Sequence, residues 1–399
     1  MTPESFLNTV FFSNSRSCPT LSDYSISMEY NTSKSISKQA FDKRFNNRTK
    51  AMLLQLLQEV IASQISRKSI YSRSLFSEIR IMDSSEFRVT KNLADSFPGY
   101  GGSGTDAVAQ VQLEYELLRG KVTELSLGSA LDSDVTAGRK QLDQIPPNAL
   151  LLRDLGYNSP KVLEEISQRD IYFVSRAKAQ WSMFIKHDGE LKKLTIQDIR
   201  NKLTSQKEKY LDLEIFLGSK ILMPVRLIAN LLTEEQRQVR IKKKRSKRGA
   251  LSKLAEESSG LNLFVTNIEK DKCSAKSVYE LYTLRWQIEL IFKTWKSILQ
   301  LHKIHAMNAV RLECVILIKF IWVMLNWSIL KLFEETSRKE ISLHKFTRTM
   351  VDRSTTLNLS LLQDPESFYK WLMKLNKITR KHHEKEYKKG SKLIAEILI

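Results

Sequence analysis

The pattern of apolar and polar positions predicts helices at the start of the chain. In residues 38–48, Phe41 and Phe45 fall on one side of a helix that Ser37 is suited to cap. The basic residues on the other side are Lys43, Arg44 and Arg48. The pattern stays helical over residues 51–65. Residues 1–70 are therefore predicted to form a helical module, which suits either DNA backbone binding or an ordinary helical hairpin.

From residue 77 the pattern becomes extended. Residues 111–117 alternate apolar and polar side chains with a period of two, which predicts a strand. The other predicted strands are 78–82, 121–127, 149–153 and 172–175, and Ser159-Pro160 predicts the start of a helix. Three strands followed by alternating strand and helix predict an α/β core with a mixed sheet, whose first part covers residues 71–178.

A long polar interval then interrupts the predicted core. Its short extended pieces are 181–185, 210–217 and 221–231, which predict a β-rich insertion over residues 179–260. Another strand, at residues 261–266, opens the second part of the core.

The predicted core ends at residue 333, and residues 334–399 are predicted to form a helical tail. Helical stretches lie around residues 368–378, and a basic run covers residues 380–389. The tail suits dimer contacts or DNA binding, and the sequence does not decide between them.

One segment of the second core part carries a polar face of unusual composition. At about 100° per residue, a helix places Tyr282, Arg285, Glu289 and Lys296 within a sector of roughly 60°. Apolar residues on the opposite side are Leu284, Ile288, Ile291, Trp295 and Ile298. A carboxylate among cations favours a metal ion beside a phosphodiester, although exposed ion pairs worth about 0.2–0.5 kcal/mol are the ordinary alternative.

Two aspartates supply possible partners for Glu289. Asp83 and Asp154 each follow a predicted strand. The carboxyl ends of strands are where α/β proteins gather ligands. Either aspartate alone is more often a turn-forming residue, but both together with Glu289 favour a shared site.

Overall charge favours a polyanionic partner. The 399 residues carry a formal net charge of +20, with a pI near 9.7. No stretch reaches the ~18 uninterrupted apolar residues of a membrane span, and the most apolar segment, 312–333, predicts a buried helix. The amino terminus shows no secretory signal, and three scattered cysteines fit a reducing cytoplasm. Nucleic acid is therefore the expected partner, with no membrane.

A basic run inside the insertion is a second candidate contact with nucleic acid. Seven of the nine residues from Arg240 to Arg248 are basic. The run is either a solvated loop or a contact with a phosphate backbone, and the overall charge favours the contact. The predicted DNA-binding residues here are Arg240, Lys242, Lys243, Lys244 and Arg245.

Across residues 79–326, these motifs together resemble the bacterial DDE transposases of the insertion-sequence-four type, which bear a Tyr-Arg-Glu-Lys signature. The resemblance rests on Asp83 in Ile-Met-Asp-Ser, on Asp154 in Arg-Asp-Leu-Gly-Tyr, and on the four residues of the polar helix face. It implies a ribonuclease-H-like core, in which the first and fourth strands lie side by side, interrupted by the β-rich insertion.

The resemblance also implies roles for these residues. Asp83, Asp154 and Glu289 would be catalytic residues that hold two Mg²⁺ or Mn²⁺ ions. Tyr282, Arg285 and Lys296 would contact phosphates of double-stranded DNA, at the element ends and the target. The implied reaction is cleavage at insertion-sequence ends followed by strand transfer, performed by a homodimer on DNA in the bacterial cytoplasm, associated with the nucleoid.

Two alternatives stay open from the sequence. One is a catalytically silent DNA-binding relative of such enzymes, which would bind DNA but not cut it. The other is a nuclease on the same core, which would cut DNA without strand transfer. The terminal repeats, the target sequence, a hairpin route of excision and the number of protomers cannot be read from the chain.

Overall fold

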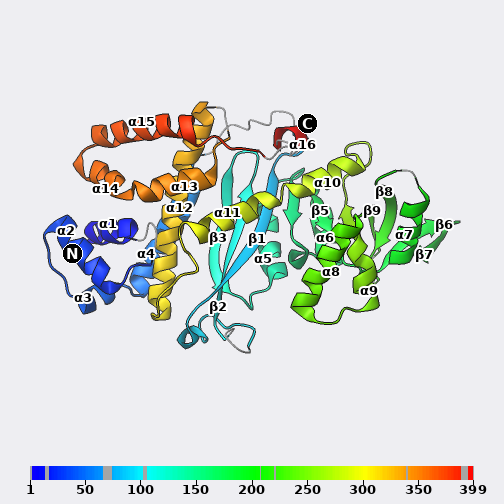
Figure 1. The fold of residues 1–399 in the computed structure, drawn as a ribbon, viewed down its shortest axis with the longest axis horizontal. Coiled ribbons are helices and arrows are strands. Elements are labelled where there is room, and N and C mark those ends of the chain that lie inside the picture. Colours follow the sequence, from blue (N-terminus) through cyan, green and yellow to red (C-terminus); the bar gives the residue numbers. More distant parts are fainter. Residues whose placement is uncertain are drawn as a thin grey trace. The chain divides into compact units, whose positions relative to one another are not determined.

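The computed structural model describes residues 2–13, 18–65, 74–101, 106–206, 208–219, 222–337, 340–387 and 394–398. The chain forms two compact units (Figure 1). The first unit consists of Met1–Ser72, Ser84–Asp132 and Gln287–Ser391, and the second of Arg73–Asp83, Ser133–Trp286 and Lys392–Ile399. Residue 221 of a predicted strand and residues 388–389 of the basic run lie outside the described residues.

The second unit is built on a mixed sheet. Its strands follow the order β1-β4-β5-β10-β9-β8-β6-β7. Their bounds are β1 (Ile79–Arg88, with its first half in this unit), β4 (Leu150–Arg153), β5 (Tyr172–Arg176), β6 (Met183–His187), β7 (Glu190–Lys193), β8 (Leu211–Leu217), β9 (Met223–Leu231) and β10 (Leu261–Thr266). Strands β1, β4 and β5 pair in parallel, and the pairs from β5 to β7 are antiparallel. The prediction of a mixed α/β sheet is confirmed.

Helices pack on this sheet and close its core. They are α5 (Asp134–Lys140), α6 (Pro160–Ser167), α7 (Ile196–Ser205), α8 (Glu234–Arg248), α9 (Lys253–Glu257), α10 (Ala275–Thr283) and α16 (Ile394–Leu398), with 3-10 turns η2 (Leu142–Gln144), η3 (Leu155–Tyr157) and η4 (Ser258–Gly260). Ser159 caps α6 through the Val162 amide, as predicted. Leu163 of α6, Ile199 of α7 and Leu227 of β9 belong to one buried apolar cluster.

The insertion contains more helix than the sequence pattern predicts. Strands β6, β8 and β9 confirm the three extended pieces, but β7 and helices α7, α8 and α9 were not predicted. The basic run lies on α8 and not in a loop. Thr233 caps α8 in a capping box with Gln236, which explains why a helix starts there despite the polar sequence.

Strand β1 runs further than predicted. The predicted end at Asp83 is wrong, because β1 continues to Arg88. Only its parallel pairing with β4 stops there, with Met82 opposite Arg153 as the last register pair. The polar residues after Met82 stay extended, since strand formation depends more on neighbouring strands than on intrinsic propensity.

The first unit contains the antiparallel pair β2 (Val108–Glu116) and β3 (Lys121–Ser129). Every residue of β2 is buried, including the polar half of its alternating pattern. Glu116 accepts hydrogen bonds from the backbone amides of Leu118 and Arg119 at 2.8 and 2.7 Å. Glu114 accepts one from the Thr123 hydroxyl at 3.0 Å. Internal hydrogen bonds therefore let both faces of this strand be buried.

Helices form the rest of the first unit. They are α1 (Pro3–Ser13), α2 (Leu21–Thr32), α3 (Lys38–Asp42), α4 (Asn47–Ala62), α11 (Trp286–Ser297, from Gln287 onward), α12 (Ala309–Ser337), α13 (Leu343–Asp352), α14 (Ser354–Gln363) and α15 (Pro365–His382), with the turn η1 (Lys91–Leu93). Ser37 caps α3 through the Ala40 amide, and Phe41 and Phe45 are buried, as predicted. Helices α1 and α4 both pack against α12.

Helix α12 is the central helix of this unit. By length and composition it is apolar enough to cross a membrane, but 78% of its most apolar window is buried in the structure. Such burial is typical of a core helix and matches the helix predicted over residues 312–333. Lys319 is buried in it, donates to the Leu299 carbonyl at 3.0 Å, and has its pKa lowered to about 8 by burial.

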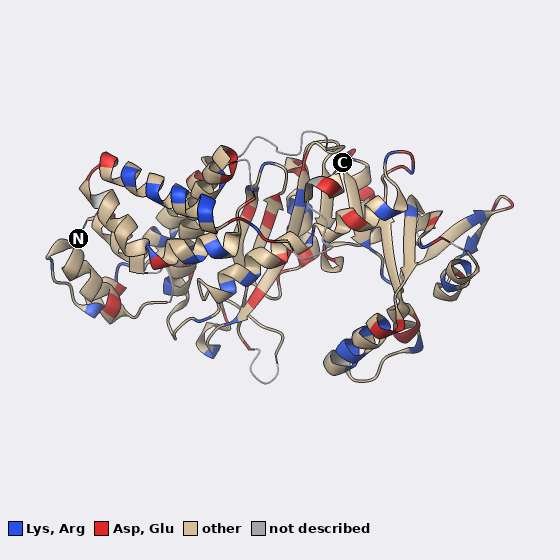
Figure 2. Ribbon diagram, turned by 45° about the horizontal axis from the view of Figure 1, so that its top comes forward, with Lys and Arg blue, Asp and Glu red and all other residues tan. Residues whose placement is uncertain are grey.

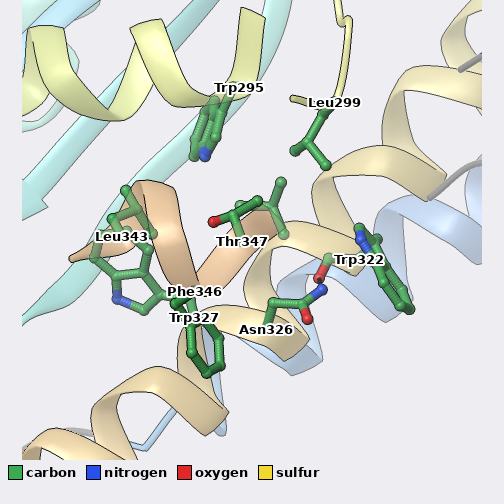
Figure 3. A pocket seen from close by; sticks show the side chains of 9 residues that line it. Trp295, Leu299, Trp322, Asn326, Trp327, Leu343, Phe346 and Thr347 are labelled. Atoms are coloured by element: carbon green, nitrogen blue, oxygen red, sulfur yellow. Dashed lines mark hydrogen bonds between the residues drawn. The ribbon is translucent and has the colours of Figure 1, made fainter. Parts of the chain in front are cut away.

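A small cavity marks the packing of α11 on α12 and α13 (Figure 3). Its lining includes Trp295 of α11, Trp322 and Trp327 of α12, and Phe346 of α13. Its volume of about 10 Å³ is at the lower limit for one water molecule, so it cannot admit a nucleotide. The aromatic packing around it fixes the apolar side of α11.

Candidate functional site

Asp83 and Asp154 lie at matching positions on neighbouring parallel strands. Met82 of β1 and Arg153 of β4 are the last residues of the two strands that pair. Asp83 directly follows Met82, and Asp154 directly follows Arg153. Neighbouring strands are about 4.8 Å apart, so the two aspartates start side by side at one edge of the second unit's sheet. The prediction that the first and fourth strands are neighbours is confirmed.

Neither aspartate acts as an ordinary turn residue. Asp83 lies inside a strand. Asp154 precedes η3, but its side chain makes no capping hydrogen bond. Its backbone carbonyl instead accepts from the Tyr157 amide at 3.1 Å and from the Asn158 side chain at 3.3 Å. The carboxylate is thus not used to close the turn, which argues against the turn-forming alternative.

Residues that the sequence reasoning missed hold the Asp154 segment in place. Arg153 is 1% exposed and donates to the Gly138 carbonyl at 2.9 Å. Asn158 donates to the Ser175 hydroxyl of β5 at 2.9 Å. A β-carbon at Gly138 would lie 3.0 Å from the Arg153 guanidinium, so the glycine makes room for it. The arginine in an otherwise apolar strand was the available sequence signal.

Arg285 forms an ion pair with Asp83. Its Nη1 donates to Asp83 Oδ2 at 2.9 Å, and the two side chains are 15% and 18% exposed. The guanidinium carbon lies 5.9 Å from the centre of the Tyr282 ring. Tyr282 also contacts Phe264 of β10, with ring centres 5.0 Å apart. Burial raises the pKa of Tyr282 to about 12, so it stays a neutral phenol at pH 7.

The four signature residues do not share one helix, and the prediction of a single helix is wrong. Tyr282 is on α10, Arg285 lies between the helices, and Glu289 and Lys296 are on α11. The backbone amides of Leu284 and Arg285 donate three residues back, to Leu281 and Tyr282, which ends α10 in a tight turn. Periodicity alone cannot show such a break, because one tightened turn leaves the apolar side almost unchanged.

Glu289 and Lys296 belong to the first unit. Leu284, Ile288, Ile291 and Trp295 of the predicted apolar stripe are buried, whereas Ile298 is only half-buried. Glu289 is half-buried. Lys296 donates to the Glu86 carbonyl of β1 at 3.1 Å, and burial lowers the pKa of its ammonium group.

The donor chemistry fits a hard divalent cation. Within the residues that the structure describes, no group of three or more His, Cys, Asp or Glu side chains is close enough to hold one ion. The structure brings together Asp83 and Asp154 on neighbouring strands, whereas Glu289 is on α11 of the other unit. Two carboxylates at one sheet edge supply the oxygen ligands that Mg²⁺ and Mn²⁺ prefer.

The five predicted DNA-binding residues of α8 divide into two groups. Arg240 donates to the Leu261 carbonyl and to Asn262 Oδ1, both at 2.8 Å, and burial lowers its pKa. Lys244 donates to the Ser259 hydroxyl at 2.8 Å and to the Ala255 carbonyl at 3.2 Å. Arg245 pairs with Glu256 at 3.2 Å. Among the described residues, only Lys242 and Lys243 of the five are exposed and have no side-chain hydrogen bond or ion pair within the protein.

Comparisons with known proteins identify the family of the chain. The family model described as a transposase DDE domain matches residues 74–325. The transposase for insertion sequence element IS231B of Bacillus thuringiensis subsp. berliner is 30% identical over 387 residues, covering 91% of this chain and 81% of the relative. The IS1151 transposase of Clostridium perfringens is 29% identical over 357 residues, covering 84% and 75%. The chain therefore belongs to the bacterial insertion-sequence transposases with a DDE domain, enzymes that cleave and transfer DNA strands.

Proposed function

We propose that Asp83, Asp154 and Glu289 are the catalytic carboxylates of this transposase and that they hold two Mg²⁺ or Mn²⁺ ions. The DDE family generally uses a divalent metal. A pair of such ions activates the attacking oxygen and stabilises the leaving oxygen of a phosphodiester. The observation that supports the assignment most is the parallel pairing of β1 and β4, which ends immediately before Asp83 and Asp154.

The reaction needs no covalent bond to the protein. A water molecule attacks the phosphodiester at an element end, and the freed 3′-hydroxyl then attacks target DNA. The three carboxylates would hold the ions, which would supply Lewis-acid stabilisation of the reacting oxygens. Arg285, beside Asp83, keeps this carboxylate oriented.

Tyr282, Arg285 and Lys296 bind phosphates of the element end in this proposal. Arg285 presents several N–H donors in a planar fork, so it can hold Asp83 and still donate to a phosphate oxygen. Tyr282, as a neutral phenol, can donate its O–H. Lys296 contributes a point charge. On α8, Lys242 and Lys243 are the members of the basic run that stay available to a phosphate backbone.

The assembled enzyme in this proposal is a homodimer on DNA, and it works at the nucleoid of the bacterial cytoplasm. The relatives are transposases of bacterial insertion elements, which act on DNA in that compartment. The dimer follows from the family resemblance, because two element ends must be brought together before strand transfer.

Replacing Glu289 by alanine tests the catalytic assignment. With its carboxylate gone, we expect Mg²⁺-dependent cleavage of DNA carrying an element end to be abolished, while duplex binding at low salt persists. Single-turnover cleavage on sequencing gels, with new 3′ ends mapped, measures the first, and gel shifts measure the second.

Glu59→Ala is the matched control, because Glu59 is exposed on α4 of the same unit. It should cleave like the unchanged protein. Retained cleavage by Glu289→Ala, with a normal thermal unfolding curve, would refute the role of Glu289.

A further inference from the structure

Helix α15 carries an exposed basic face. Asp364 caps the helix through the Ser367 amide, and Pro365 occupies its first turn. At about 100° per residue, its exposed lysines fall within a sector of roughly 60°. These are Lys370, Lys374, Lys377 and Lys381. Figure 2 shows Lys and Arg positions in blue along the helix that Figure 1 labels α15.

The opposite face of α15 is used for packing. The helix contacts α14 and α12. Leu375 is 3% exposed and Thr379 is 1% exposed. The indole of Trp371 donates to the Thr356 hydroxyl of α14 at 3.1 Å. Packing therefore covers Leu375 and Thr379, whereas the lysine side faces outward.

Three of the four lysines lack internal bonds such as those of Arg240, Lys244 and Arg245 on α8. Lys370 pairs with Glu366 at 2.7 Å, an exposed pair. The side chains of Lys374, Lys377 and Lys381 form no hydrogen bond or ion pair with any residue that the structure describes. The sequence between Glu366 and Glu384 contains no acidic residue.

Like charges four residues apart on a helix repel each other and destabilise it. Lys370 with Lys374, and Lys377 with Lys381, have this spacing. The free protein therefore bears a small electrostatic cost along α15, which a polyanion would relieve. The row from Lys370 to Lys381 is about 16 Å long at 1.5 Å per residue, comparable with the width of a DNA groove and its flanking phosphates.

We propose that the Lys370–Lys381 face of α15 binds the phosphate backbone of duplex DNA without reading its sequence. Lysines are compact point charges and lack the fork geometry that arginine uses to read guanine. The proposal rests on the action of the family on DNA and not on the catalytic carboxylates. Of the two roles that the sequence leaves open for the carboxyl-terminal tail, dimer contacts and DNA binding, this surface favours DNA binding.

The test is the triple variant Lys374→Gln/Lys377→Gln/Lys381→Gln. Each lost phosphate contact lowers the slope of log affinity against log salt by about 0.9. We therefore expect the slope for a random-sequence duplex without element ends to become shallower by about 2–3, measured between about 50 and 200 mM salt. The single variant Lys377→Gln should give about one third of this change, and it serves if the triple variant is unstable.

Lys186→Gln/Lys192→Gln/Lys193→Gln is the control, because these lysines are exposed on β6 and β7 and the net charge changes equally. Its slope should stay close to that of the unchanged protein. An unchanged slope in the α15 variant, or an equal decrease in the control, would overturn the proposal. So would loss of binding to phosphatidylglycerol vesicles without any change in DNA binding.

Failure of this proposal is distinguishable from failure of the catalytic assignment. Glu289→Ala should keep the full salt slope on the random duplex, since it removes no cation. Suppose that cleavage depends on Glu289 but that the salt slope of DNA binding is the same with and without the α15 lysines. That result would refute only the proposed DNA contact of α15.

Discussion

The β1–β4 edge and helix α8 both carry charged residues that the sequence assigns to DNA chemistry, but the structure uses them differently. At the edge, Asp83 and Asp154 follow paired positions of neighbouring strands, and Asp83 forms an ion pair with Arg285. On α8, Arg240, Lys244 and Arg245 bond to the neighbouring β10, η4 and α9 segments. A high density of charged residues therefore does not show which side chains bind a ligand. The internal hydrogen bonds and ion pairs of each side chain show whether it is available to do so.

The difference has a physical origin. A charged group that is half-buried must be compensated, and on α8 carbonyl and hydroxyl oxygens of the same unit provide this. At the β1–β4 edge, Asp154 makes no capping hydrogen bond, and Arg285 donates to the Asp83 carboxylate. Our proposal places the divalent ions at that edge.

Among substitutions of cationic residues, Arg285→Ala should reduce DNA cleavage most. A smaller reduction than for the α8 cations would contradict the difference drawn between the two regions. Arg285→Ala removes both the partner of Asp83 and a phosphate donor, so we expect single-turnover cleavage of end DNA to fall by roughly 10²–10³-fold. Arg285→Lys should recover part of this, because it keeps the charge but not the fork. Unchanged cleavage by Arg285→Ala would show that the ion pair with Asp83 is only structural.

Arg240→Ala and Lys242→Gln/Lys243→Gln should separate the two groups on α8. Loss of the two Arg240 hydrogen bonds should lower the free energy of unfolding by about 1–3 kcal/mol. The lysine pair should leave it unchanged and instead make the salt slope of DNA binding shallower by about 2. Denaturant unfolding and salt titrations measure these quantities. The reverse result, with Arg240→Ala fully stable but weak on DNA, would contradict the division.

Much of the fold could be predicted from apolar patterning. Strands β2 to β5 and β8 to β10, the Ser37 and Ser159 caps and the buried α12 follow from period and capping chemistry. The helical form of the basic run was missed, because a polar helix held by arginine and lysine bonds has no apolar stripe. The end of β1 was misplaced, because hydrogen bonding to neighbouring strands outweighs the polarity of its own residues.

In the candidate site, too, some features could be predicted from the sequence and others could not. Adjacency of Asp83 and Asp154 follows from the sequence only through the family resemblance, because strand order is a tertiary property. The Asp83–Arg285 pair joins residues 202 positions apart, which no local pattern can reveal. The turn between α10 and α11 depends on two backbone hydrogen bonds and not on side-chain periodicity.

Iron-directed cleavage of the polypeptide tests the central claim most directly. Fe²⁺ can replace Mg²⁺ at carboxylate sites, and with ascorbate and peroxide it cuts the backbone beside the bound ion. On protein bound to end DNA, we predict cuts around Asp83, Asp154 and Glu289 that excess Mg²⁺ suppresses together. Cuts confined to other segments, or cuts near Asp83 and Asp154 that never extend to Glu289, would contradict a shared site of these three carboxylates.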